Sequence, residues 1–273
     1  MKIISSILPA TFSLLILLGF SCSKTPSDPE EFGEKVLETF AKDDFDSFLE
    51  MTASSLSQSQ MEDVMNHLRE KNLERLKKEL EEETDEEEKE NIQERINEME
   101  EVTEEEFAVG AKNFFLKTTL EEVDYEEWKE IKEKGRDQDI DMLQKRILKK
   151  EREGDVPDYM TERLKTLKNL TIGSKEYDEW KESLDSRNEK WKESFNDIVR
   201  DAKSAGINWE DVKFEYVDFD KEKKEDRGNY NMMLVFSYRD ENYKIELDDC
   251  VDSPLGIIIG DEPIWEGSFS KSD

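Results

Sequence analysis

The spacing of apolar residues changes once along this chain, and this change restricts its possible folds more than any other feature. Up to about Gly206, apolar side chains recur every three or four residues, as they do on one face of a helix. After Gly206 they alternate with polar residues, which is typical of strands with one buried face. The sequence therefore predicts an α+β protein in which helices come first and an antiparallel sheet follows.

Four strands are expected within residues 207–267, and they form a four-stranded antiparallel β-meander. Their expected positions are 212–216, 230–238, 243–247 and 255–259. Residues 221–228 form a charged turn between the first two strands. Because only helices can cover the apolar face of this sheet, we expect residues 29–273 to form a single α+β domain.

A long charged helical hairpin is expected over residues 57–101. Residues 69–106 contain 18 acidic and 7 basic side chains, and the apolar stripe there is one residue wide. Such helices are exposed on most faces and project from the body of a protein. The hairpin is either an acidic arm presented to a partner protein or a solvated surface whose charges pair along the helix, as Glu74 can with Lys78.

Local signals place the other helices. Asp28 followed by Pro29 is typical of a helix start, and Asp44 is expected to begin a second helix. Capping boxes are expected at 84–87 and 103–106. Further helices are expected near 125–134, 138–152, 158–169 and 175–205, with Gly135, Gly154 and Gly206 as stop signals.

One segment recurs within the chain. The residues from Asp124 to Glu130 return 52 positions later, so that Trp180 corresponds to Trp128. A third fragment begins at Trp191, which lies three helical turns after Trp180 and therefore on the same face. These tryptophans form either a platform for carbohydrate or a part of the core, and core packing is the usual role of aromatic residues at helical spacing.

The first 21 residues have the features of a cleaved signal peptide. Lys2 precedes an uncharged apolar stretch that ends in Gly19-Phe20-Ser21, directly before Cys22. This arrangement resembles the lipobox of bacterial lipoproteins, which implies that Cys22 becomes the acylated N-terminus and that residues 22–28 form a lipidated tether. The alternative is ordinary cleavage after Ser21. Within the lipoprotein family, Ser23 after the cysteine implies the outer rather than the inner membrane.

The composition excludes several kinds of function. A net charge of −31 repels nucleic acid, so we expect no nucleic-acid partner. We find no catalytic constellation, metal site or cofactor motif: His67 is the only histidine, and the calcium-loop pattern that starts at Asp137 lacks its glycine and its glutamate. Cys250 is expected to be a small buried residue on a strand rather than a reactive thiol.

The two ends of the mature chain resemble small bacterial lipoproteins with cystatin-like or nuclear-transport-factor-two-like α+β folds. The segments that carry this resemblance are 36–46, 243–247 and 257–265. The long helical middle departs from that pattern as an insertion. We therefore expect a non-enzymatic, lipid-anchored protein of the bacterial cell envelope that acts as an interaction or structural module. The alternative is a binder of a small apolar ligand or peptide in a cavity between sheet and helices.

Overall fold

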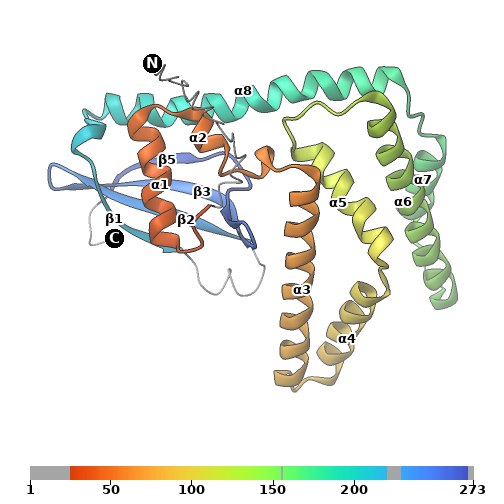
Figure 1. The fold of residues 1–273 in the computed structure, drawn as a ribbon. Coiled ribbons are helices and arrows are strands. Elements are labelled where there is room, and N and C mark those ends of the chain that lie inside the picture. The colour runs from red at the N-terminus through yellow and green to blue at the C-terminus, as the bar shows by residue number, and fades with distance from the viewer. Residues whose placement is uncertain (1–24, 155, 220–228, 270–273) are drawn as a thin grey trace, which may run out of the picture.

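The computed structural model describes residues 25–154, 156–219 and 229–269. It confirms the α+β class: in the described part of the chain eight α-helices precede an antiparallel sheet, and some of these helices pack on it (Figure 1). The helices are α1 Pro29–Lys42, α2 Phe45–Leu49, α3 Gln58–Glu82, α4 Glu86–Glu101, α5 Glu104–Thr118, α6 Tyr125–Glu153, α7 Asp158–Asn169 and α8 Ser174–Ser204. The strands are β1 Lys213–Phe219, β2 Asn229–Tyr238, β3 Glu241–Ser253, β4 Gly256–Ile258 and β5 Ile264–Phe269.

The sheet has the predicted meander order β1-β2-β3-β4, with every neighbouring pair antiparallel. A fifth strand, β5, was not predicted. It pairs with the first half of β3, whereas β4 pairs with the second half. The 13-residue length of β3 makes this division possible. The predicted turn at 221–228 lies outside the described residues.

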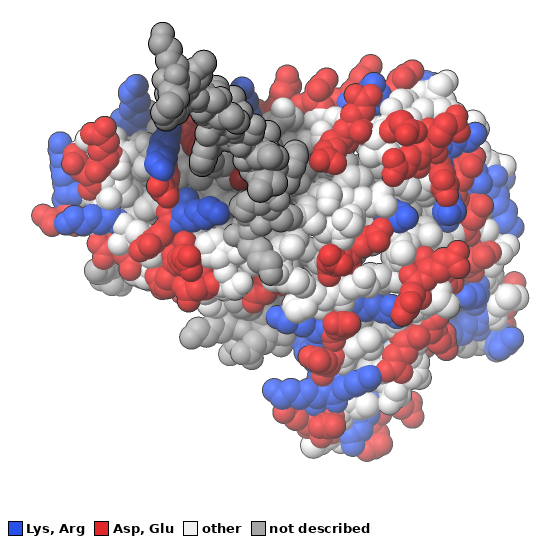
Figure 2. All heavy atoms as spheres, in the orientation of Figure 1, with Lys and Arg blue, Asp and Glu red and all other residues white. Residues whose placement is uncertain are grey.

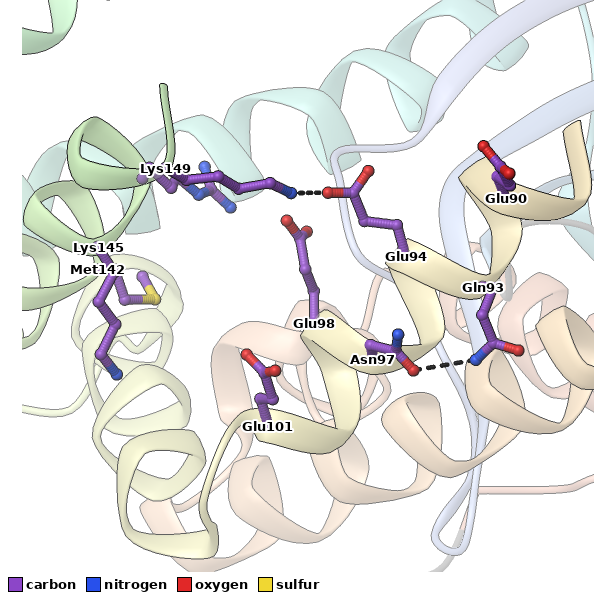
Figure 3. A pocket seen from close by; sticks show the side chains of 10 residues that line it. Glu90, Gln93, Glu94, Asn97, Glu98, Glu101, Met142, Lys145 and Lys149 are labelled. Atoms are coloured by element: carbon purple, nitrogen blue, oxygen red, sulfur yellow. Dashed lines mark hydrogen bonds and ion pairs between the residues drawn. The ribbon is translucent and has the colours of Figure 1, made fainter. Parts of the chain in front are cut away.

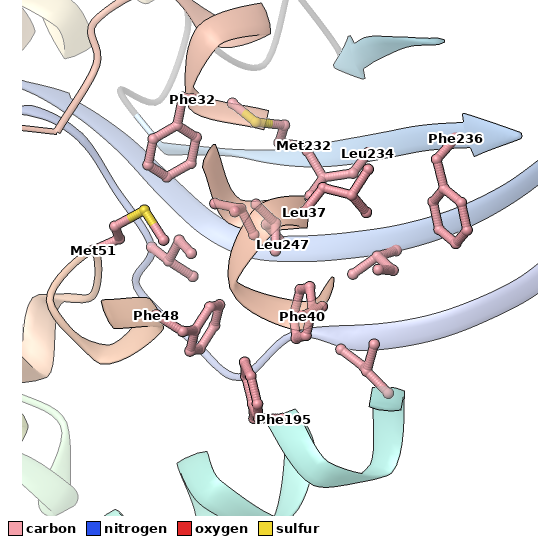
Figure 4. Packing of buried hydrophobic residues seen from close by; sticks show 14 of the residues in the cluster. Phe32, Leu37, Phe40, Phe48, Met51, Phe195, Met232, Leu234, Phe236 and Leu247 are labelled. Atoms are coloured by element: carbon pink, nitrogen blue, oxygen red, sulfur yellow. The ribbon is translucent and has the colours of Figure 1, made fainter. Parts of the chain in front are cut away.

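The first core lies between the sheet and the helices α1, α2 and α8 (Figure 4). Phe40 stacks on Phe195 with ring centroids 4.8 Å apart, and both rings are fully buried. Gly33 lets α1 approach the sheet closely, because a Cβ there would lie 2.6 Å from Cγ2 of Val217. The side chains of the protein itself therefore fill the space between sheet and helices.

A second core joins α3, α5, α6 and the first half of α8. Helix α8 belongs to both cores, and it runs along one side of the molecule from the helical part to the sheet (Figure 1). Trp180 and Leu184 pack in the second core, whereas Trp191 and Phe195 pack in the first. A single apolar face of one helix thus connects the two cores.

The predicted charged hairpin is formed by α3 and α4, and it has a small cluster of its own. Leu76, Ile92 and Ile96 are buried there, apart from the two larger cores. The second helix of the hairpin is capped by Asp85, which accepts hydrogen bonds from the backbone of Glu87 and Glu88, so the prediction of a capping box beginning at Thr84 was wrong by one residue. The predicted capping box from Thr103 to Glu106 is confirmed.

Gly135 is not a stop signal, and the two helices predicted at 125–134 and 138–152 are one helix, α6. The glycine serves packing instead. A Cβ at this position would lie 1.8 Å from Nδ2 of Asn113 on α5, so only glycine leaves room for that side chain. Gly154 does end α6, in the left-handed conformation that glycine favours (φ 83°). None of the helices in the described ranges has the length and apolar composition needed to cross a bilayer.

Candidate functional site

The residues singled out in the sequence lie in different parts of the structure. Cys22, the predicted lipidation site, lies outside the described residues. Cys250 is fully buried on β3, as predicted. His67 is half-buried on α3, far in sequence from Cys250. The stretch that begins at Asp137 is part of helix α6 and forms no loop. Among the described residues, no group of three His, Cys, Asp or Glu side chains is placed to hold a metal ion.

The two copies of the repeat pack against each other. The ring centroids of Tyr125 and Tyr177 are 5.4 Å apart, and those of Trp128 and Trp180 are 6.3 Å apart. Trp128, Trp180 and Trp191 are exposed by 2, 9 and 4 % only. Core packing is therefore confirmed, and the tryptophans form no exposed platform.

Next to this aromatic cluster lies a hollow of about 650 Å³, which we call the α6–α8 hollow. It is bounded by α5, α6, the end of α7 and the start of α8. Its polar and aromatic lining residues include Asn113, Lys117, Trp128, Lys132, Arg136 and Trp180. The apolar ones are Met142, Leu167, Leu170 and Ile172, and the acidic ones are Asp139, Glu176 and Glu179.

One end of the hollow is cationic. Lys117 and Lys132 line it, and neither has a carboxylate within ion-pair distance among the described residues. Burial lowers the pKa of the Lys132 ammonium, and the charges of Lys117 and Arg187 lower it further. Three cations thus act on one another, and no carboxylate of the described chain forms an ion pair with either lysine.

Arg187 stands behind this end of the hollow. Its Nη1 donates to the backbone carbonyl of Leu116 at 3.2 Å and also to that of Lys117. These carbonyls belong to the last turn of α5, where a cation is favoured. Nε and Nη2 of Arg187 are buried and have no hydrogen-bond partner in the described chain. Burial lowers the pKa of the Arg187 guanidinium from its usual value.

The two central tryptophans differ in their hydrogen bonding. Nε1 of Trp180 donates to the carbonyl of Leu116 at 2.8 Å. Nε1 of Trp128 is buried and, within the part of the chain that the structure describes, has no acceptor. A buried N–H without an acceptor is costly, so it marks a place where an acceptor is missing.

The other end of the hollow is apolar. Along α6, Met142 lies ten residues after Lys132, which corresponds to about 15 Å of helix. Helix α7 lies against α6, Nη1 of Arg136 donates to the carbonyl of Leu170 at 3.5 Å, and Met142, Leu167 and Leu170 line the same hollow. Met142 and Leu170 are 36 and 47 % exposed. The hollow therefore changes from cationic to apolar along its length.

Two of the three acidic residues in the hollow already have partners. Glu176 accepts a 3.0 Å hydrogen bond from the backbone N–H of Gly173, and Glu179 forms a 3.2 Å ion pair with Lys175. These carboxylates are engaged at the start of α8 and do not neutralise the cationic end. Asp139 is exposed and lies two turns of α6 beyond Lys132.

A second hollow, also of about 650 Å³, lies between α4 and α6 and is called the α4–α6 groove. Helix α4 presents Glu94 and Glu98 toward Lys145 and Lys149 on α6, and an ion pair joins Glu94 to Lys149 (Figure 3). The side chains of this pair are about half exposed. Such pairs contribute little and are screened by salt. Because the acidic and basic side chains of the groove face each other, they leave less unpaired charge for a ligand than the α6–α8 hollow does.

The α6–α8 hollow was not predicted from the sequence, although the repeat contained a signal for it. The residue four positions after the tryptophan is Leu184 in the second copy and Phe195 in the third fragment, and both are buried. In the first copy this position is Lys132. A cation in place of a core residue marks the point where the apolar packing gives way to the hollow.

No family model matches this sequence, and neither a curated protein nor a solved structure is significantly similar to it. The resemblance to cystatin-like and nuclear-transport-factor-two-like lipoproteins therefore stays a prediction.

Proposed function

We propose that this chain is a non-catalytic, lipid-anchored protein of the bacterial cell envelope, on the outer rather than the inner membrane, and that it serves as an interaction module. The observation that carries the proposal is the position of Cys22 directly after the apolar segment at the N-terminus. Acylation of this cysteine would attach the folded body to the membrane surface.

The start of the described chain is consistent with a body held close to that surface. Thr25 donates from Oγ1 to the carbonyl of Leu255 at 3.0 Å, and the backbone N–H of Ile257 donates to the carbonyl of Pro26 at 3.0 Å. Gly256 leaves room for this contact, because a Cβ there would lie 1.9 Å from the carbonyl oxygen of Thr25. From Thr25 onward the predicted tether therefore lies against the sheet.

Only Ser23 and Lys24 then separate the anchor from the packed chain, which is a span of about 10 Å at most when extended. On this proposal, the edge of the sheet around β4 faces the membrane closely. The net charge of −31 opposes contact with anionic lipid, so the acyl anchor has to hold the body against this repulsion.

The interaction surface on this proposal is the hairpin α3–α4. It has a separate small cluster and carries exposed carboxylates at its tip, including Glu81, Glu87 and Glu90. Acidic side chains also cover much of the rest of the visible face, with Lys and Arg among them (Figure 2). A cationic partner would therefore need the projecting shape of the hairpin as well as its charge.

Anchoring is tested with the full chain expressed in a bacterium with an outer membrane. We expect the protein in the outer-membrane fraction, with an intact mass that corresponds to cleavage before Cys22 and acylation. Cys22→Ser removes the attachment point, whereas Cys250→Ser changes a cysteine that the anchor does not use. Recovery of wild-type protein in the cytosol with Met1 attached, or equal membrane binding by both variants, would overturn the proposal.

The interaction part is tested separately by cross-linking in intact cells. A variant with Glu81, Glu87 and Glu90 changed to Gln removes three charges from the hairpin. The matched control changes Asp185 to Asn and Glu189 and Glu193 to Gln on the exposed face of α8. We expect cross-links to a cationic protein to be lost in the hairpin variant alone. An identical pattern in the two variants would exclude the hairpin as the interface.

The alternative function is binding of a small apolar ligand, and the cavity for it was predicted between the sheet and the helices. The best candidate in the structure is the α6–α8 hollow instead. Side chains fill the space between sheet and helices, as the contact of Phe40 with Phe195 illustrates. The α6–α8 hollow is open and has an apolar end.

A further inference from the structure

We propose that the α6–α8 hollow binds a small amphipathic carboxylate, with the carboxylate group between Lys117 and Lys132 and the apolar body along Met142, Leu167 and Leu170. This inference is independent of the lipid anchor and of the acidic hairpin, so it can fail while the proposed function stands.

The charge of the site is the first argument. The protein carries 71 acidic and 40 basic residues, so a lysine has many possible partners. Salt bridges join some of the other basic residues to acids, for example Lys134 to Glu130 at 2.7 Å on the same helix. Lys117 and Lys132 line the same hollow, the charges of Lys117 and Arg187 act on Lys132, and no carboxylate lies within ion-pair distance of either lysine in the described chain. A bound anion would supply the opposing charge for these lysines.

The position of Lys132 in the repeat is the second argument. The equivalent residues in the other copies are Leu184 and Phe195, and both are buried in a core. An apolar side chain at position 132 would extend the second core in the same way. A half-buried ammonium without a partner lowers stability, since the charge is partly removed from water. Residues that lower stability in this way are concentrated at binding sites, where the ligand supplies the compensating contact.

The available donors select the anion. Lys117 and Lys132 both line the hollow, and their ammonium groups can bind carboxylate oxygens. Glu176 and Glu179 also line the hollow, and even with their own partners they repel an anion in proportion to its charge. A carboxylate with a single charge therefore suits the site better than a phosphate.

The apolar end determines the rest of the ligand. Met142, Leu167 and Leu170 line it, and Met142 is a flexible side chain that adapts to different apolar shapes. A hollow of about 650 Å³ lies within the range of small-molecule sites. Burial of an apolar body there removes exposed apolar surface from both molecules. An aliphatic carboxylate such as a fatty acid and a short peptide with an apolar C-terminal residue share this chemistry.

The test is calorimetric titration of the full-length protein with decanoate, decanol and decyltrimethylammonium, each below its micellar concentration. We expect one decanoate per protein and at least tenfold weaker binding of the other two compounds. N-acetyl-Gly-Ala-Leu-Leu and its C-terminal amide form a second pair. Tighter binding of decanoate identifies an aliphatic acid as the better ligand, and tighter binding of the free-acid peptide identifies a peptide terminus.

Two variants show whether the binding occurs in the hollow. Lys132→Met keeps most of the length of the side chain and removes the charge, and we expect at least a tenfold loss of affinity for the better carboxylate. Lys134→Met makes the same change on the same helix outside the hollow, and we expect a change below twofold. Melting curves of both variants establish that they are folded.

Three results would overturn the inference. One is an absence of binding by both decanoate and the free-acid peptide. The second is equal affinity for decanoate and decanol, which would remove the role of the carboxylate. The third is an equal effect of Lys132→Met and Lys134→Met, which would place the binding elsewhere.

Discussion

Nε1 of Trp180 on α8 donates a 2.8 Å hydrogen bond to the backbone carbonyl of Leu116 on α5. Trp128, the equivalent residue in the first copy of the repeat, is as deeply buried but has no acceptor for its Nε1 among the described residues. The two tryptophans therefore make similar apolar contacts but differ by one hydrogen bond, and this difference can be measured.

The change of Trp180 to Phe should destabilise the protein more than the change of Trp128 to Phe. Both changes remove buried apolar volume, but only the first removes a satisfied hydrogen bond, worth about 1 kcal/mol. We expect a loss of about 2–3 kcal/mol for Trp180→Phe and about 1 kcal/mol less for Trp128→Phe, measured as the free energy of unfolding in urea. Equal losses would show that Trp128 also has a hydrogen-bond partner.

The close packing of Gly135 against Asn113 predicts a strong coupling between these two positions. Alanine is the better helix former by about 1 kcal/mol, but in the wild type its Cβ would displace the Asn113 side chain and its 3.2 Å hydrogen bond to the carbonyl of Val109. Gly135→Ala should therefore destabilise the wild type and stabilise the Asn113→Ala variant by about 0.5–1 kcal/mol. A double-mutant cycle measures this coupling. Additive effects would contradict the close contact.

Gly135 and Asn113 also show why one part of the fold could not be predicted from the sequence. Spacing and caps predicted most elements, because helix starts such as Asp28 and Thr103 depend on neighbours three residues away. The continuity of α6 through Gly135 depends on Asn113, which is 22 residues distant in the chain. A contact of this kind leaves no local signal, so the glycine resembled a helix end.

The candidate site was harder to predict than the fold for a similar reason. The three neighbouring cations come from α5, α6 and α8, and no periodicity brings Lys117, Lys132 and Arg187 together. The repeat did contain one local sign, since Lys132 occupies a position at which the other copies have apolar residues. Strand β5 was missed because the polar and small residues 266–268 interrupt the alternation that marks the other strands.

The unpaired ammonium of Lys132 makes the stability of the protein depend on pH in a defined direction. The pKa of Lys132 in the folded state is below the usual value of 10.5, chiefly because of burial. The charged ammonium of Lys132 therefore lowers the stability of the folded protein. This penalty is fully present below the folded-state pKa and disappears as the pH rises toward 10.5. Lys132→Met should therefore melt roughly 1–3 °C above the wild type at pH 7, and the gap should narrow as the pH increases.

Lys134 provides the control for this measurement. Its pKa is raised by the hydrogen bond and the charge of Glu130, so its contribution to stability is favourable and is lost as the pH rises above 10.5. Lys134→Met should then be no more stable than the wild type at pH 7. Calorimetric melting curves between pH 7 and 10 distinguish the two lysines. A lower melting temperature for Lys132→Met at pH 7 would mean that Lys132 has a carboxylate partner.

Arg69 should hold the α3–α4 hairpin together far more effectively than the exposed ion pairs of the hairpin. Its Nη2 donates to the carbonyls of Met99 at 2.8 Å and Val102 at 2.7 Å, at the end of α4. Its guanidinium also lies 5.0 Å from the centre of the Phe107 ring. Helix α4 has no basic residue in its own last turn, so Arg69 supplies the cation that a helix C-terminus favours.

The change of Arg69 to Met should speed hydrogen exchange in the last two turns of α4 by about tenfold or more, which corresponds to about 1.4 kcal/mol. Lys77→Met is the matched control, because Lys77 also joins α3 to α4 through a 2.7 Å ion pair with Glu100. Both side chains of that pair are about half exposed, so water and salt replace the interaction at little cost. Exchange should therefore change less than twofold in the control. If the two variants exchanged equally fast, the carbonyl contacts of Arg69 would contribute no more than a surface ion pair, and the apolar cluster around Leu76, Ile92 and Ile96 would hold the hairpin together.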